Sequence, residues 1–425
     1  RFALRLDPFT YTQSREFNPF FSTWNTSELK SSSALFSISQ PILLTDGTLS
    51  LQNQFAWRDS YSEYQDSKSK TFSNNLYVSF DQPLFTYNRT KLALAEVQLD
   101  LENALLNYKI RELMLERMVS QRFYSTYQNR MALQVAREDY LNREQSYEII
   151  RNKVDAGLAA QEELYQAELN MATSESEVQN QQVNLDNSLD ELKRLIGISV
   201  FDEIAVTANI TMDSVVVDMQ KALDFGIKNR LELRQRDINI EISRANLTRS
   251  AAINEFKGNL SLSYGIIGND EALPDIYKAP TKNQRINIAF DIPLWDWGER
   301  ESRIKAAEKS IEQNNISLSD EKTNIIIAIR QAYRNIQNQV LQVDLARQNV
   351  RTAQLTYDIN LERYKNGDLT SMDLNLFQNQ LSQKKIGLIN AMISYKLHLL
   401  DLKIESLWDF EKNEPVFDLE SVTYE

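Results

Sequence analysis

The sequence predicts an α+β membrane protein in which four short amphipathic strands per chain are joined to coiled-coil helices of roughly 105 Å. Three observations support this fold class. The chain is internally duplicated, each copy contains strands with strict apolar and polar alternation, and each copy continues into a long heptad pattern. The composition agrees, because only 10 Gly and 8 Pro among 425 residues allow long uninterrupted elements.

Charge and composition exclude several classes of protein. The formal net charge of −12 argues against nucleic-acid binding, which needs a basic surface. The absence of cysteine excludes disulfides and thiolate metal sites. The sequence contains no run of about 18 apolar residues, so it predicts no transmembrane helix. Its first residues lack the basic-then-apolar pattern of a signal peptide. We therefore expect that any signal has been removed or lies upstream of Arg1.

The duplication is clearest at FDQPLF (80–85), which returns 210 residues later as FDIPLW (290–295). The same offset relates further residues, without a gap, over about 85 residues. These are Gln121 with Gln331, Ala136-Arg137 with Ala346-Arg347, Tyr147 with Tyr357, Gly157 with Gly367, and Leu164 with Leu374.

Four segments alternate between apolar and polar residues and predict two β-hairpins: LSLQNQFAW, TFSNNLYVSFD, LSLSYGI and RINIAFD. Each segment is about nine residues long, which suffices for a strand tilted across a bilayer. The opposing faces, rich in Ser, Asn and Gln, suit a water-filled lumen better than a dry core. The alternative is a soluble protein in which the strands end in a buried core.

Each predicted hairpin ends at a proline, Pro83 or Pro293, where a strand is expected to give way to a helix. Proline has no N–H for a β-ladder and fixes φ for a first helical turn. The neighbouring aromatic residues Phe85, Trp295 and Trp297 are expected at a membrane–water interface.

Downstream of each proline, apolar residues recur every seven positions and predict left-handed coiled-coil packing, with one four-residue step in each copy. Neither Gly nor Pro interrupts residues 86–156 or 299–366. Each helix is expected to end at an isolated glycine, Gly157 or Gly367, in a left-handed cap. A second helix follows each glycine, so each copy forms an antiparallel hairpin; the alternative for its tip is a plain turn without function.

Four strands cannot close a barrel, and hydrocarbon tolerates no open sheet edge, so the chain is expected to oligomerise. Two copies would give 8 strands with a filled interior, and three would give 12 strands with a lumen.

In the order and spacing of these features, the chain resembles the TolC-type outer-membrane factors, the outer membrane efflux protein family. The matching features are the duplication, the strand hairpin followed by P-L-[FW] and a long helix, and the tip pattern in GDLTSMDL (367–374). Two segments are similar to the family's segments around its second hairpin: RLELRQRDINIEISRANLTRSAAINEFKGNLSLSYG and IPLWDWGERESRIKAAE. Two further segments, ALPDIYKAP and SQPILLTDGTLSL, are similar to segments found in a Bacteroidetes-like branch of this family. The resemblance covers nearly all of residues 34–410.

The resemblance implies a homotrimeric 12-stranded outer-membrane β-barrel, continued into the periplasm by an α-helical barrel of coiled-coil hairpins. It implies that the protein is the exit duct of an efflux or type I secretion system, with a periplasmic adaptor (membrane fusion) protein and an inner-membrane RND or ABC transporter as partners and outer-membrane lipid around the barrel. The family's first helix is expected upstream of Arg1, or absent or removed here. The expected segments are an N-terminal extended segment (1–48), first β-hairpin (49–84), first helical hairpin (85–196), equatorial segment and helix (197–257), second β-hairpin (258–297), second helical hairpin (298–408) and C-terminal equatorial segment (409–425).

Residue by residue, the resemblance also implies two functional sites at the periplasmic tips. The adaptor-binding tip falls on Ala156, Gly157, Leu158 and Ala159 in the first copy and on Asn366, Gly367, Asp368 and Leu369 in the second. A ring of gate carboxylates falls on Asp373 and Glu163, while the family's second gate Asp falls on Leu376. Three carboxylates around a narrow pore would bind cations and repel anions. The alternative for Asp373 is an acid that complements the helix dipole.

No sequence pattern supports catalysis, a cofactor or a metal site. The only histidine, His398, lies in the apolar stretch YKLHLLDL, and the common nucleotide, hydrolase and zinc motifs are missing. Two alternatives to a duct are a soluble coiled-coil scaffold without transport activity and a self-contained porin. The scaffold leaves the amphipathic strands unexplained, and a passive pore needs no helices of this length.

Overall fold

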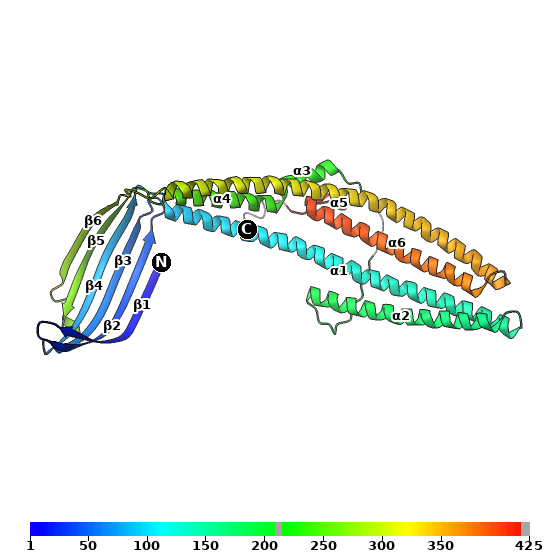
Figure 1. Ribbon diagram of the computed structural model, residues 1–425, viewed down its shortest axis with the longest axis horizontal. Helices are drawn as coiled ribbons and strands as arrows, with labels where there is room; N and C mark the ends of the chain where they lie inside the picture. Colours follow the sequence, from blue (N-terminus) through cyan, green and yellow to red (C-terminus); the bar gives the residue numbers. More distant parts are fainter. Residues whose placement is uncertain (209–214, 418–425) are drawn as a thin grey trace. The chain divides into compact units, whose positions relative to one another are not determined.

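The computed structural model describes residues 1–208 and 215–417 in two compact units (Figure 1). The first unit combines Arg1–Leu101 with Ile238–Asn315, and the second combines Glu102–Asp237 with Ile316–Glu425. Residues 209–214 and 418–425, which belong to the two expected equatorial segments, lie outside the described residues.

The first unit contains one antiparallel sheet in which six strands follow their order in the chain (Figure 1). The strands are β1 (Phe2–Asn18), β2 (Thr23–Pro41), β3 (Thr48–Ser62), β4 (Ser67–Leu84), β5 (Lys257–Asp270) and β6 (Thr281–Asp291). The predicted hairpins are β3–β4 and β5–β6, and β4 pairs with β5. The two copies of the duplication therefore meet at the β4–β5 pair.

The expected number of four strands is wrong, because β1 and β2 form a third hairpin within residues 1–48. This part of the sequence contains Pro8 and Pro19, which disfavour a helix. Pro8 lies at a register shift in an edge strand, where a missing N–H breaks no ladder, and Pro19 lies in the turn between the strands. A signal for β2 was present, since SISQP at 37–41 repeats the strand ending SFDQP at 79–83.

The register places apolar and polar side chains on opposite faces of the sheet, as the alternation predicted. One apolar row of partners crosses five strands through Phe2, Ile38, Leu51, Val78 and Tyr264. The adjacent row, one residue along each strand, consists of Ala3, Ser37, Gln52, Tyr77 and Gly265. On the apolar face, the register partners Lys30, Asp59 and Lys70 form a charged row, and the apolar surface ends there.

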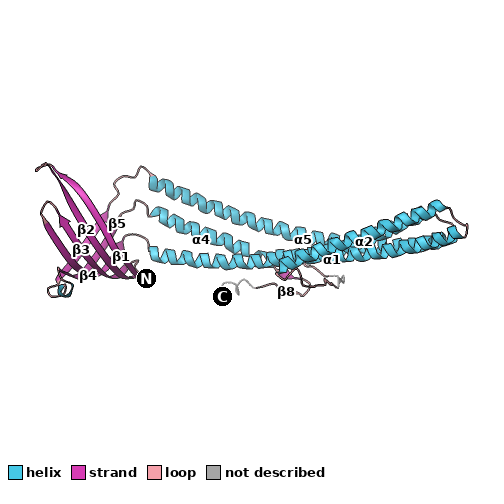
Figure 2. Cartoon of the chain, turned by 90° about the horizontal axis from the view of Figure 1, so that it is seen from below, coloured by secondary structure: helices cyan, strands magenta, loops and turns pink. Residues whose placement is uncertain are grey.

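The four long helices lie within a few residues of their predicted ranges. They are α1 (Arg89–Asp155), α2 (Gln161–Ile196), α5 (Glu299–Asn366) and α6 (Ser371–Ser406). Figure 2 shows the short turn that joins α1 to α2. The helix expected within the equatorial segment 197–257 is divided at Arg230, whose extended backbone separates α3 (Met219–Asn229) from α4 (Leu231–Ala251). Short elements complete the chain: η1 (Leu273–Asp275), β7 (Trp408–Asp409) and β8 (Glu414–Pro415).

The heptad positions differ in burial between α5 and the first half of α1. Ile325, Ile329, Ile336 and Val343 of α5 form one core with residues of α3, α4 and α6. A second core near the helix ends joins α1, α2, α5 and α6. By contrast, the heptad residues Leu94, Leu101, Tyr108 and Leu115 of α1 are exposed within one chain.

Among the described residues, the structure contains no helix that is both long and apolar enough to cross a membrane.

Candidate functional site

Both helical hairpins turn at the predicted glycines, and both turns use the same hydrogen bonds. Gly157 has φ +77° and Gly367 has φ +90°, the left-handed region that glycine adopts without strain. At the first tip, Gly157 N–H donates to the Val154 carbonyl (2.9 Å) and Leu158 N–H donates to the Lys153 carbonyl (2.8 Å). The second tip has the equivalent bonds from Gly367 (3.1 Å) and Asp368 (2.9 Å). This pair of bonds is the Schellman motif, which ends a helix and satisfies its last carbonyls.

The remaining predicted tip residues are accessible. Ala156, Leu158, Asn366 and Asp368 are exposed, whereas Ala159 and Leu369 are partly buried against the core beneath them. Leu158 is 78% exposed and so presents an apolar side chain to solvent. Sequence reasoning missed Met372, which is 77% exposed at the second tip.

The two tips are held together by a core around Tyr364 of α5. Ile150 of α1, Ala167 of α2 and Leu374 of α6 are buried in the same cluster. The Tyr364 hydroxyl donates to the Ser146 carbonyl (3.3 Å), and burial raises the pKa of this phenol to about 12. The Lys153 ammonium lies 4.9 Å from the centre of the Tyr364 ring and donates to the Tyr364 carbonyl. Tyr364 lies on the seven-residue apolar repeat of α5, which does not predict these polar contacts.

Below this core, Arg143 of α1, which is itself buried, forms a polar layer with α6. Its guanidinium pairs with Asp139 one turn earlier (2.7 Å) and donates to Asn375 (3.2 Å) and Asn379 (2.7 Å). Ser382 of α6 donates to the other oxygen of Asp139 (3.2 Å). This layer was not identified from the sequence, because its residues lie far apart in the chain and match no motif.

The two expected gate carboxylates occupy different local environments. Asp373 lies in the first turn of α6, where its N–H donates to the Thr370 hydroxyl oxygen (3.2 Å) and the hydroxyl donates to its carboxylate (2.7 Å). Thr370 is therefore the N-cap of α6, with a further bond from its hydroxyl to the Asp373 carboxylate. Glu163 occupies the matching position in α2, but the residue matching Thr370 is Ala160, which provides no side-chain cap. Asp373 lies in the first turn of α6, where an acid can complement the helix dipole, and its role in a gate stays a prediction.

The two strand–helix junctions lie at the same end of the sheet, because Leu84 pairs with Gly258 and Gly258 pairs with Phe290. Pro83 is inside β4, and Pro293 follows β6. Phe85 and Trp297 have positive φ values of 60° and 57°, so each junction contains a sharp left-handed turn. The turns explain how an extended chain enters a helix within a few residues.

A carboxylate supports each new helix. At the first junction, Asp46 from the β2–β3 turn accepts bonds from the Thr90 N–H (2.8 Å) and hydroxyl (2.7 Å). Burial opposes ionisation of Asp46 most strongly, but the bonds from Thr90 and Arg89 and the Arg89 charge together lower its pKa. At the second junction, Asp296 accepts from the N–H groups of Gly298 (3.0 Å) and Arg300 (3.1 Å).

The aromatic residues of the junctions are exposed, and their place at a membrane–water interface stays a prediction. Phe85 is in ring contact with Phe256 (5.4 Å between centroids), while Trp295 and Trp297 meet edge to face (5.9 Å). Trp297 is 89% exposed.

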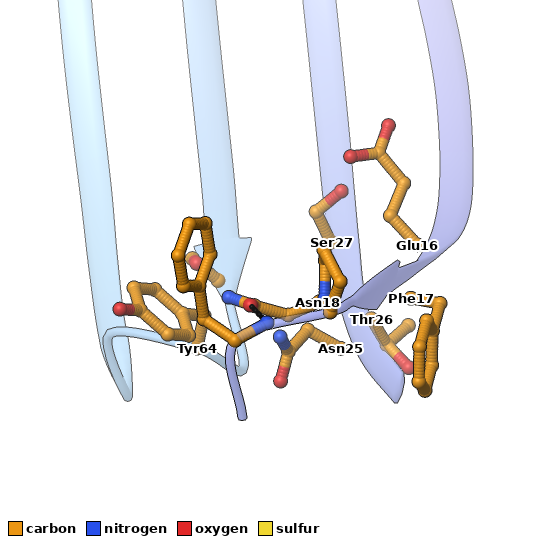
Figure 3. Close-up of a pocket in the computed structure, with 10 residues that line it drawn as sticks. Glu16, Phe17, Asn18, Asn25, Thr26, Ser27 and Tyr64 are labelled. Atoms are coloured by element: carbon orange, nitrogen blue, oxygen red, sulfur yellow. Dashed lines mark hydrogen bonds between the residues drawn. The ribbon is translucent and has the colours of Figure 1, made fainter. Parts of the chain in front are cut away.

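At the opposite end of the sheet, the β1–β2 and β3–β4 turns enclose a shallow hollow of about 430 Å³ (Figure 3). Thr26 N–H donates to the Glu63 carboxylate (2.6 Å), which joins the two turns. Phe17 and Trp24 are in ring contact (5.3 Å), as are Phe21 and Tyr64 (5.8 Å). The hollow is open and contains no arrangement of groups that points to a particular ligand.

Within residues 1–208 and 215–417, no three His, Asp or Glu side chains lie close enough together to hold a metal ion.

Comparisons with known proteins identify relatives of one kind. Residues 226–403 match the family model described as "Outer membrane efflux protein". The chain is 24% identical over 229 residues to "Outer membrane protein TolC" of Salmonella enteritidis, covering 52% of this chain and 46% of that protein. It is 22% identical over 312 residues to "Cation efflux system protein CusC" of Escherichia coli (strain K12), covering 72% of this chain and 66% of that protein. The chain thus spans about half of the first relative and about two thirds of the second.

A solved structure extends the similarity over the whole chain. The outer membrane channel CmeC of Campylobacter jejuni superposes with a TM-score of 0.69 at 14% identity, covering 99% of this chain and 81% of CmeC. The predicted fold class is thereby confirmed, with six strands in the sheet of each chain in place of four.

Proposed function

The chain is a TolC-type member of the outer membrane efflux protein family, and from this premise we propose that it forms an outer-membrane exit duct for efflux or type I secretion. It passively conducts substrates that an inner-membrane pump delivers through a periplasmic adaptor. The observation that supports this proposal most strongly is the combination, in one chain, of a two-faced sheet with long helical hairpins that have matched tips.

The sheet supplies the wall of the duct in the outer membrane. Its apolar face carries Leu49, Leu51 and Val78, which suits hydrocarbon, and its other face carries Ser50, Gln52 and Ser79, which suits a water-filled lumen. The charged row at Lys30, Asp59 and Lys70 ends the apolar face where headgroups and water would begin.

The helices supply the periplasmic part of the duct. With 67 residues in α1 and 68 in α5, each extends about 100 Å at 1.5 Å per residue. The exposed heptad residues of α1, Leu94, Leu101, Tyr108 and Leu115, would be covered by neighbouring copies in a homotrimer. The energy for transport would come from a partner, an RND or ABC transporter of the inner membrane.

The tips would be the docking site of the adaptor and the position of the gate. Leu158 and Met372 offer exposed apolar contacts beside the rigid glycine turns at Gly157 and Gly367. Asp373 and Glu163 would bring carboxylates of three copies near the entrance, which favours cations over anions.

Reconstitution of the purified protein in a planar bilayer tests the proposal. We expect trimers that need detergent for extraction, produce discrete ion currents and hydrolyse no ATP. A protein that is extracted without detergent and carries no current would favour the coiled-coil scaffold instead. ATP hydrolysis by the pure protein would refute passive conduction.

A further inference from the structure

The β1–β2 hairpin continues both faces of the sheet. In β1, Phe2 and Leu4 pair with Ile38 and Phe36 of β2, and all four share the face of Leu51 in β3. The side chains between them, such as Ala3, Ser37 and Ser39, lie on the polar face. The hairpin therefore has the pattern of a membrane-spanning pair of strands, and β1 and β2, with 17 and 19 residues, exceed the length that such strands need.

This hairpin occupies the edge that β3 would otherwise present to a neighbouring copy. The β2–β3 register runs without a shift from Ser27 opposite Ser62 to Pro41 opposite Thr48. Every residue of β3 thus has a partner in β2. A β3 strand covered along its whole length cannot also pair with another chain.

The sheet of one chain has its outer edges at β1 and β6, and both edges are apolar on the same face. Among the described residues, no strand pairs with the outer side of either. Phe2 and Leu4 of β1 are 76% and 62% exposed, and Ile286 and Ile288 of β6 are 77% and 57% exposed. Unpaired backbone N–H and C=O groups are not tolerated in hydrocarbon, so these edges need partners when the sheet is in a membrane.

The two edges are complementary in direction. All five neighbouring pairs are antiparallel, so β1 and β6 run in opposite directions. A β6 strand placed beside β1 of another copy would therefore continue the antiparallel order without interruption. The chemistry of the faces would also continue, with Ile286 and Ile288 beside the apolar face of Phe2 and Leu4.

We propose that β6 of one copy pairs antiparallel with β1 of the next, so that each copy contributes six strands and a trimer closes an 18-stranded barrel. The inference rests on the proposed function, because it needs the sheet to lie in a membrane and the copies to be three. The diameter of a barrel grows roughly linearly with strand number, so this one would be about 1.5 times as wide as a barrel with four strands per copy.

Cysteine cross-linking in the outer membrane tests the junction, and the 425 residues contain no cysteine that would interfere. Ala3→Cys or Arg5→Cys is combined in turn with Asn283→Cys, Arg285→Cys, Asn287→Cys or Ala289→Cys, all on the polar face. We expect covalent dimers and trimers after mild oxidation. Moving the first cysteine from position 3 to position 5 should move the best partner two residues toward the start of β6, as antiparallel pairing requires.

Two matched variants complete the design. Ser37→Cys with Gln52→Cys joins register partners of one chain and should cross-link only within monomers. Ser50→Cys with the same β6 positions reports pairing of β3 with β6 of a neighbour, and we expect no dimers from it.

Outer-membrane fractionation and the size of the detergent-extracted particles separate the possible outcomes. Trimers in the outer membrane that cross-link through Ser50→Cys would overturn the inference and leave the proposed function intact. The same conclusion follows from membrane trimers without any β1–β6 cross-link, which would mean that another segment covers β1. A chain that reaches neither the outer membrane nor a trimer would refute both.

Discussion

Replacing Arg143 by Met should loosen the packing of α1 against α6 close to the helical tips. The guanidinium is 9% exposed and forms three polar contacts, to Asp139, Asn375 and Asn379. Methionine retains much of the apolar stem but leaves the Asp139 carboxylate, itself 14% exposed, with only the Ser382 hydroxyl as a partner from another helix. An uncompensated charge would thus remain on a side chain that is largely buried.

The expected cost can be estimated from this geometry. Removal of one partner from a buried ion pair typically costs about 3–5 kcal/mol. The lower value applies here, because Asp139 keeps one hydrogen-bond donor and a small exposed area. About 3 kcal/mol corresponds to roughly a hundredfold increase in the population of the locally open state.

Hydrogen–deuterium exchange of the intact trimer measures this opening directly. Peptides covering 139–146 and 375–382 should exchange roughly a hundredfold faster in Arg143→Met than in the unmodified protein. Arg151→Met is the matched control, since its pair with Glu148 is exposed (54% and 53%), and it should change local stability by less than about 0.5 kcal/mol. The double variant Arg143→Met with Asp139→Leu should regain most of the protection, because it removes both charges.

A small effect would refute this reasoning. If exchange in Arg143→Met increases no more than in Arg151→Met, the polar layer does not stabilise the tip. If the double variant is no better protected than the single one, the lost contacts to Asn375 and Asn379 outweigh the unpaired charge.

Three further predictions concern the tips and the first junction. Asp373→Asn should lower the cation preference of single channels. Thr370→Val removes the cap but keeps the charge, so it should leave the cation preference unchanged. Equal effects of the two variants would assign Asp373 a structural role at the start of α6 only. Gly367→Val should destabilise the second tip by more than about 1 kcal/mol, and Gly367→Asn should destabilise it by clearly less, because Asn tolerates positive φ. Hydrogen–deuterium exchange of residues 360–374 measures the loss of stability. Equal destabilisation by the two variants would mean that the positive φ of Gly367 is not its cause. The bonds from Thr90 lower the folded-state pKa of Asp46, so its stabilisation is present above the ordinary value of 3.8 and is lost as the pH falls through the lower folded value. Asp46→Asn should thus speed exchange in the first turn of α1 at neutral pH and remove this pH dependence, whereas an unchanged pH profile would exclude the carboxylate as its source.

The long helices and their turns were predictable because each depends on local chemistry. Uninterrupted heptads define a coiled-coil helix whatever its partner is, and an isolated glycine after the last apolar position ends it. The structure places these turns at Gly157 and Gly367, as predicted. The N-cap of α6 was also predictable, because Thr370 lies three residues before Asp373 and its hydroxyl can accept from the Asp373 N–H.

The N-terminal hairpin was missed because its local signals conflict. Pro8 argues against a strand, and only its place at a register shift in an edge strand makes it acceptable. That place depends on β2, which is itself located by its pairing with β3. A strand that is recognised only through its neighbours is difficult to identify from alternation alone.

The sequence by itself determined the period of each element: two residues in the strands, seven in the long helices, and 210 between the two copies. These periods follow from the geometry of a single segment, so they can be read without knowledge of its neighbours. Only the tertiary structure decided which segments meet. It placed β2 against β3, joined the two copies through β4 and β5, and gathered Arg143, Asn375 and Asn379 into one layer. The physical reason is that such pairings form between residues distant in the chain, where backbone hydrogen bonds and buried charges select a partner that no local pattern names.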